Sequence, residues 1–195
     1  MRRALAAVAV DNHRPLHRQP SRQVREARVR VGEPLAIIRQ MKRVNLFTQP
    51  VEYDESDPEG FKAGMSRFGP SIGASMLGGS IYELPPGQAI CPYHYEYGNE
   101  EWLLVLEGPV MLRHPEGEEQ LERGDVVCFP VGPEGAHKVS NPGEETARVL
   151  MVSTMIEPSV AVYPDSDKLG VWPGDKRDNL MVRRGSAVDY WEGEG

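Results

Sequence analysis

The feature that most restricts the fold of this chain is the close spacing of its turns. The 195 residues include 17 prolines and 20 glycines, spread along the whole length, and these residues interrupt regular structure wherever they occur. No window of about twelve residues carries an apolar stripe at the helical spacing i, i+3, i+4, i+7. Because short extended segments joined by turns fit this pattern, the sequence predicts an all-β domain.

The apolar runs between these turns have the length of strands. We expect strands at 80–84, 90–97, 102–106, 110–113, 126–129, 137–141, 147–154 and 160–163. The chain after these runs lacks a clear pattern but carries large apolar residues, among them Trp172, Leu180, Tyr190 and Trp191. We therefore expect the C-terminal part to dock on the domain.

The length and the charge distribution predict one domain preceded by a different segment. Residues 1–40 carry nine arginines against three acidic residues, whereas residues 41–195 carry 13 basic and 26 acidic residues, a net charge of −13. We interpret 1–40 as a basic, disordered tail or an upstream extension, and 41–195 as a single barrel with flanking arms. An acidic body argues against nucleic acid as a partner, because binding a phosphate backbone needs clustered cations.

Other sequence features bear on location. No apolar run approaches the 18 or so residues that a membrane-spanning helix needs, so we expect no membrane partner. The apolar run 4–10 follows two arginines but lacks a cleavage pattern, which argues against a secretory signal. Cys91 and Cys128 are the two cysteines and form no CxxC pair. They predict free thiols in a reducing, cytoplasmic environment.

A first cluster of chemically active residues lies between Gly87 and Gly108. Residues i and i+2 of a strand point to the same face, so His94 and Glu96 are expected to point together to one side. Glu101 follows after a polar loop. Tyrosines 93, 95 and 97 would occupy the opposite face, and a row this apolar needs a cover: a terminal segment or a second subunit. In the alternative interpretation the tyrosines face the core and His94 and Glu96 lie on the surface.

A second cluster, between Gly124 and Asn141, favours the first of these interpretations because it supplies His137. His94, Glu96, Glu101 and His137, converging from separate strands, predict a metal site. Two imidazoles with one or two carboxylates suit Mn(II), Fe(II), Ni(II) or Zn(II). The alternative is a metal-free barrel in which these groups bond to one another or to a ligand. It is disfavoured because two carboxylates buried close together cannot both stay charged cheaply.

The order and spacing of these residues resemble the two motifs of the cupin superfamily. The first motif runs from Gly87 through His94-Tyr95-Glu96 and Glu101 to Gly108, and the second runs from Gly124 through Pro130-Val131-Gly132 and His137 to Asn141. Three departures stand out. Glu96 replaces the second histidine of the first motif, one extra residue precedes His94, and the loop before His137 is two residues longer. Glu96 as a ligand is thus an inference from its position and is not carried over from the family.

The resemblance implies a double-stranded β-helix, a jelly-roll-like barrel with the site inside its mouth. Many cupins are homodimers, so the resemblance also implies a homodimer. We expect a metal-dependent enzyme, dioxygenase or isomerase-like, acting on a small polar metabolite. The alternative is a non-catalytic module that binds a small sugar or acid. The sequence does not choose a substrate, because this fold hosts many chemistries.

Overall fold

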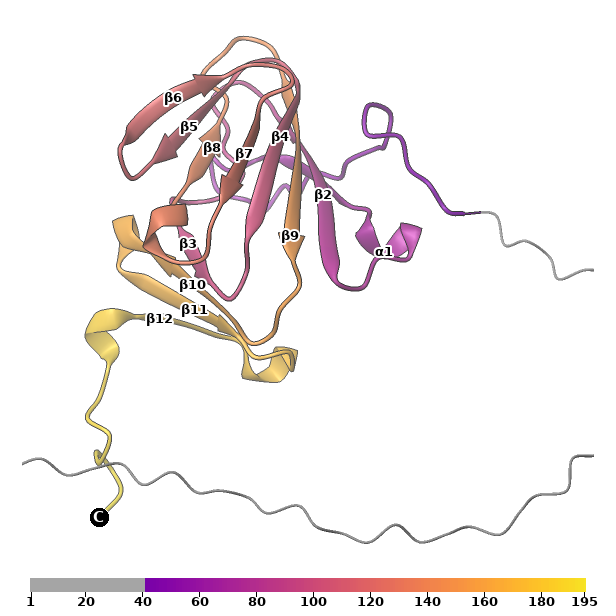
Figure 1. Ribbon diagram of the computed structural model, residues 1–195. Coiled ribbons are helices and arrows are strands. Elements are labelled where there is room, and N and C mark those ends of the chain that lie inside the picture. Colours follow the sequence, from indigo (N-terminus) through magenta and orange to yellow (C-terminus); the bar gives the residue numbers. More distant parts are fainter. Residues whose placement is uncertain (1–40) are drawn as a thin grey trace, which may run out of the picture. The chain divides into compact units, whose positions relative to one another are not determined.

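The computed structural model describes residues 41–195, and the interpretation of residues 1–40 as a basic tail lies outside this range. Within it, the regular structure is almost entirely antiparallel β-sheet, as the sequence predicted (Figure 1). The only α-helix of the described residues is a single turn, α1 (Gly69–Ile72). Four short 3₁₀ turns lie in loops: η1 (Pro133–Gly135), η2 (Pro164–Ser166), η3 (Lys176–Asp178) and η4 (Arg184–Ser186).

The strands form three sheets. A five-stranded sheet contains, in spatial order, β1 (Gly64–Arg67), β2 (Leu77–Leu84), β9 (Ala147–Thr154), β4 (Glu101–Glu107) and β7 (Val126–Phe129). A three-stranded sheet contains β6 (Gly117–Leu121), β5 (Val110–His114) and β8 (Lys138–Ser140). A four-stranded sheet contains β12 (Leu180–Arg183), β11 (Lys168–Trp172), β10 (Ser159–Tyr163) and β3 (Tyr95–Tyr97).

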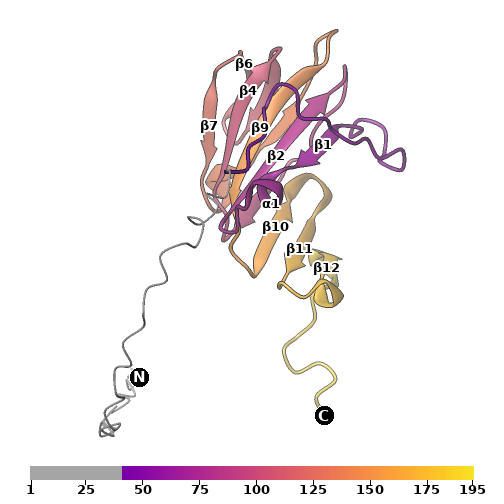
Figure 2. The ribbon, with the colours of Figure 1, turned by 90° about the vertical axis from the view of Figure 1, so that its right-hand side faces the viewer.

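The core lies between the five-stranded and three-stranded sheets. Figure 2 shows the strands of the larger sheet side by side, in the order β7, β4, β9, β2 and β1. Leu103 and Val149 from the first sheet pack in one cluster with Leu112 and Val139 from the second, and all four are buried. Burying a side chain of this size stabilises the fold by about 1.5–3 kcal/mol. Alternating residues of each strand therefore supply the interior of the jelly-roll barrel, as the period-2 pattern of the sequence requires.

The outer face of the five-stranded sheet is covered by the segment that precedes β1. Arg148, on β9, donates from Nε to the carbonyl of Leu46 (2.8 Å) and from a terminal nitrogen to the carbonyl of Gln49, and it pairs with Glu83 of β2. The Gln49 side chain in turn donates to Ser66 Oγ on β1 (3.1 Å). These contacts establish which residues of β1, β2 and β9 point away from the barrel.

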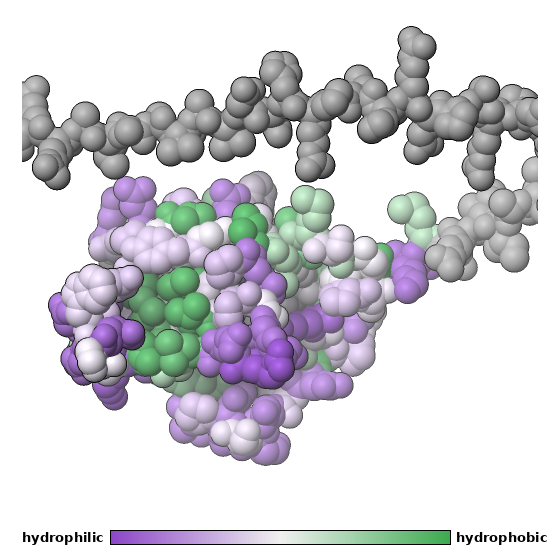
Figure 3. Space-filling view, turned by 90° about the horizontal axis from the view of Figure 1, so that it is seen from below, coloured by the Kyte–Doolittle hydropathy of each residue, from purple (hydrophilic) through white to green (hydrophobic). Residues whose placement is uncertain are grey.

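The four-stranded sheet packs against part of the predicted row of tyrosines. Tyr93 and Tyr95 are buried in one cluster with Val162 of β10 and Leu169 of β11. Val162 and Leu169 lie beside Tyr95 on the same face of the sheet, so the C-terminal strands bury these two tyrosines from the side. Tyr97, in contrast, is 46% exposed. The outward face of this sheet continues with apolar residues as far as Leu180 on β12, and an apolar area is visible on this side of the molecule (Figure 3).

Two sequence predictions need correction here. The run 90–97 was expected to be one strand, but only Tyr95–Tyr97 is a strand, and Ile90 to Tyr93 form a bend. The C-terminal segment docks only in part, because β11 and β12 join the sheet whereas Tyr190 and Trp191 are 82% and 71% exposed. Cys91 and Cys128 are free thiols, as predicted. Within residues 41–195, no helix is long and apolar enough to cross a membrane.

Candidate metal centre

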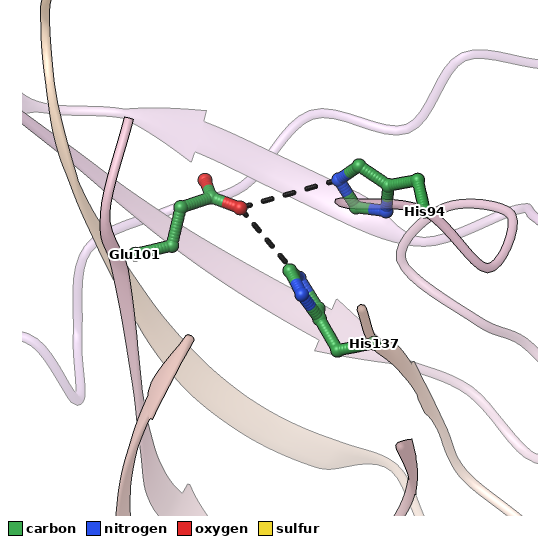
Figure 4. Close-up of side chains that lie close together, drawn as sticks. All are labelled: His94, Glu101 and His137. Carbon is green, nitrogen blue, oxygen red and sulfur yellow. Dashed lines mark ion pairs between the residues drawn. The ribbon is translucent and has the colours of Figure 1, made fainter. Parts of the chain in front are cut away.

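Three side chains from separate elements, His94, Glu101 and His137, point toward one another (Figure 4). His94 and His137 face each other as an isolated β-bridge, with His94 N–H donating to the His137 carbonyl (3.1 Å) and His137 N–H donating to the His94 carbonyl (2.8 Å). Glu101 is the first residue of β4. Its Oε2 lies 3.6 Å from His137 Nε2 and 4.0 Å from His94 Nε2.

The backbone fixes which nitrogen of each imidazole is free. His94 Nδ1 lies 3.0 Å from the Pro92 carbonyl, and His137 Nδ1 lies 2.9 Å from the Gly135 carbonyl. A carbonyl oxygen can only accept a hydrogen bond, so each Nδ1 carries the proton and donates it. Each Nε2 is then an unprotonated lone pair directed at Glu101. Carbonyls that hold Nδ1–H in this way are a common second layer of metal sites, since they set the tautomer and the ring orientation.

Aromatic neighbours hold both rings in place. The Phe129 ring stacks on His137 with centroids 3.7 Å apart and planes 7° apart. The Tyr163 ring stacks on His94 at 5.7 Å and 18°. Both histidines are buried, so the two Nε2 atoms are presented by rings with little freedom to turn.

Burial sets the charge of this group. It lowers the pKa of His137 to about 3 and, as the largest cause, lowers the pKa of His94 as well. It also raises the pKa of Glu101 to about 7, with nearby Glu96 adding to the rise. At neutral pH both imidazoles are therefore uncharged, and each Nε2 lone pair is available to a metal ion. The Glu101 side chain is then present both as the carboxylic acid and as the carboxylate.

This arrangement fits a metal ion. His94, Glu101 and His137 each offer one ligand atom, and these atoms lie within 4.8 Å of one another. Three electron-rich atoms face a common point, and a cation placed there would offset the cost of burying the Glu101 carboxylate. Imidazole nitrogen with carboxylate oxygen is a donor set that divalent transition metals accept. The buried triad could therefore bind a metal ion.

Of the four residues that the sequence proposed as ligands, three come together. Glu96 is not part of the group of potential ligands; its Oε2 accepts a hydrogen bond from Ser159 Oγ at 3.4 Å. It lies close enough to Glu101 to raise the pKa of that carboxyl group. Its role as a fourth ligand stays a prediction. Asn141 has a structural role: its side chain donates to the carbonyls of Leu84 and Glu145, both at 2.7 Å.

Sequence reasoning missed two residues beside the centre. Cys91 Sγ lies 3.5 Å from His94 Nδ1, because the bend at Ile90–Tyr93 breaks the alternation that placed it on the opposite face. Tyr163 reaches His94 from the end of β10. Tyr163 shares a face of β10 with Ala161, which is buried and lies two residues earlier. The period-2 alternation of this strand therefore places the Tyr163 side chain on the inward face.

Comparison with known proteins agrees with the motifs. Residues 80–153 match the family described as the cupin domain. The chain contains a cupin domain. That match spans both Glu101 and the two histidines. No functionally curated protein matches the chain in sequence.

Solved structures share the fold. A sugar phosphate isomerase of the cupin superfamily from Silicibacter pomeroyi superposes with a TM-score of 0.65 at 23% identity, covering 79% of this chain and 100% of its own. A candidate sugar phosphate isomerase from Acidithiobacillus ferrooxidans gives a TM-score of 0.61 at 25% identity, covering 67% and 81%. The polyketide cyclase RemF from Streptomyces resistomycificus gives 0.50 at 24% identity, covering 62% and 84%. These similarities support the cupin fold.

Proposed function

We propose that this protein is a metal-dependent enzyme that acts on a small polar metabolite. The observation that carries the proposal is the convergence of two neutral imidazole Nε2 atoms and one carboxylate on a single buried point. His94, His137 and Glu101 would hold Mn(II), Fe(II), Ni(II) or Zn(II). Three protein ligands leave coordination positions open, and a metal held this way can polarise a carbonyl or activate water or dioxygen.

The chain places proton-transfer groups beside this point. Glu96 lies close to both Glu101 and His94 and, if it is not a ligand, can accept a proton from a bound substrate. Tyr163 stacks on His94, and burial raises the pKa of its hydroxyl to about 12. The Tyr163 hydroxyl therefore keeps its proton at neutral pH and can donate it. A proton acceptor and a proton donor on neighbouring strands are what an isomerisation by proton transfer requires.

Two reaction classes remain, and different observations support them. The Glu96 and Tyr163 pair, together with the 25% identity to the candidate sugar phosphate isomerase, supports an isomerase. The set of two histidines and one carboxylate supports a dioxygenase, because this set is typical of non-haem Fe(II) oxygenases. The alternative to both is a non-catalytic module that binds a small sugar or acid in the same barrel.

One experiment separates these functions. The purified protein is loaded with one metal at a time and offered a panel of hydroxy acids, keto acids and sugar phosphates, with and without oxygen. An isomerase converts substrate at the same rate in both atmospheres and slows on Glu96→Gln. A dioxygenase consumes oxygen in proportion to product. Saturable binding of a panel member without conversion by any metal form would leave the binding module as the function.

We also propose that the protein forms a homodimer through the outward face of the four-stranded sheet. Tyr97 and Leu180 lie on this face at 46% and 52% exposure. The chain that continues from β12 carries exposed Tyr190 and Trp191. A second copy would supply apolar cover for both surfaces. The free thiols Cys91 and Cys128 support a cytoplasmic location for this assembly.

A further inference from the structure

Arg67 is the last residue of β1, at the edge of the five-stranded sheet, and its side chain is exposed. Its neighbour Ser66 points outward, because Ser66 Oγ accepts a hydrogen bond from Gln49 of the segment that covers the outer face. Successive residues of a strand point to opposite faces, so the exposed Arg67 side chain leaves β1 on the inward side of the sheet. On the next strand Arg67 is paired with Ser80. Ser80 shares the inward face with Tyr82, which packs against the barrel core.

The electrostatics of Tyr82 agree with this position. Burial raises the pKa of the Tyr82 hydroxyl to about 12, Cys91 and Glu101 add to the rise, and Arg67 opposes it. Tyr82 is thus close enough to sense the guanidinium and the carboxylate of the candidate metal centre.

No acid neutralises Arg67 within the described part of the chain. None of the salt bridges or side-chain hydrogen bonds found among residues 41–195 includes its guanidinium. The same residues carry a net charge of −13. An exposed, unpaired cation at the edge of the sheet, on the inward side of so acidic a domain, is a local attraction for an anion. A guanidinium also matches carboxylate and phosphate oxygens with two parallel hydrogen bonds.

We propose that Arg67, aided by the hydroxyls of Ser80 and Tyr82, binds an anionic oxygen group of the substrate while another part of the same molecule lies at His94, Glu101 and His137. The inference rests on the proposed function and narrows it: the substrate is a small carboxylate or phosphate ester, not a neutral sugar. Arg67 selects this substrate and takes no part in the chemical step.

The test compares charged and neutral members of matched pairs. Wild-type protein loaded with Mn(II) is titrated calorimetrically with ribose 5-phosphate and ribose, and with lactate and lactamide. We expect the charged member of at least one pair to bind ten-fold or more tightly than the neutral one, and the pair that shows this distinguishes a phosphate from a carboxylate. Absence of any such preference in the wild type overturns the inference.

Variants then assign the preference to Arg67. In Arg67→Gln the preference for the charged over the neutral member of the pair should fall at least ten-fold. Arg67→Lys should keep part of this preference, because a lysine keeps the positive charge but cannot form the two parallel hydrogen bonds of a guanidinium. Arg177→Gln is the control, since Arg177 is exposed and pairs with Asp175 on a distant turn. An unchanged preference in Arg67→Gln overturns the inference, and self-association of that variant would instead assign Arg67 to protection of the edge strand β1.

Metal content, measured on the same preparations, keeps the two proposals apart. Arg67→Gln should hold as much Mn(II) as the wild type, because Arg67 is not a ligand. A wild type that binds no metal contradicts the proposed function itself. A metal-loaded Arg67→Gln protein that keeps its preference for anions contradicts only the inference about Arg67.

Discussion

The pKa of Glu101 predicts how metal affinity depends on pH. Burial raises this pKa to about 7, whereas it lowers the pKa of His137 to about 3 and lowers that of His94. A metal ligand must be deprotonated. His137 is already neutral between pH 5 and pH 7, and burial favours the neutral form of His94 as well, so the proton that a metal displaces comes mainly from Glu101. Affinity should therefore rise about ten-fold per pH unit in this range and level off above pH 7.

The size of the effect follows from the same values. Two pH units below the pKa of Glu101 correspond to about a hundred-fold in affinity, or about 2.7 kcal/mol. Calorimetric titration with Mn(II) at pH 5, 6, 7 and 8, in buffers of different ionisation enthalpy, gives both the affinity and the number of protons released. We expect close to one proton released at pH 5 and almost none at pH 8.

Glu101→Gln is the control for this prediction. The amide keeps the shape of the side chain but has no proton to lose, so the slope between pH 5 and pH 7 should disappear and the affinity at pH 8 should fall. Affinity in the wild type that changes less than three-fold from pH 5 to pH 7 would refute the reasoning. So would release of two or more protons, which would mean that the histidines are charged in the empty site.

Three further predictions concern metal uptake, stability and assembly. His137→Ala should abolish stoichiometric metal uptake as measured by elemental analysis, and retained uptake would show that the ligand set is wrong. Asn141→Ala should lower the free energy of unfolding in urea by about 3 kcal/mol, because it leaves the buried carbonyl of Leu84 and two other backbone groups without their partner. Leu180→Lys should convert a dimer into a monomer in light scattering while metal content stays unchanged, and a dimer that persists would place the interface elsewhere.

Much of the site could be predicted because its spacing is fixed by the backbone. Gly108 has a φ of 70°, and a Cβ there would lie 3.3 Å from Ala147. Gly132, before His137, has a φ of 93°. Both conformations favour glycine, so the turns at these two positions can be recognised in the sequence by their glycines. The distance from Gly108 back to Glu101 is then a count along β4, and the short turn η1 separates Gly132 from His137.

What the sequence could not show depends on where strands stop. The alternation used to pair His94 with Glu96 assumed a continuous strand, but the chain bends from Ile90 to Tyr93 and becomes a strand only at Tyr95. The bend brings Cys91 to His94. Arg67 depends on sheet order, because its place on the inward side of the sheet follows only from the pairing of β1 with β2. No pattern within a single strand contains that information.

The most direct test of the central claim is the metal stoichiometry of the purified protein. Protein freed of metal by chelation is titrated with Mn(II), Fe(II), Ni(II) and Zn(II), and the bound ion is counted per chain. The site formed by His94, Glu101 and His137 predicts one equivalent of at least one of these ions, lost in His137→Ala. Well below one equivalent of every ion in the wild type would contradict the metal centre and the function built on it.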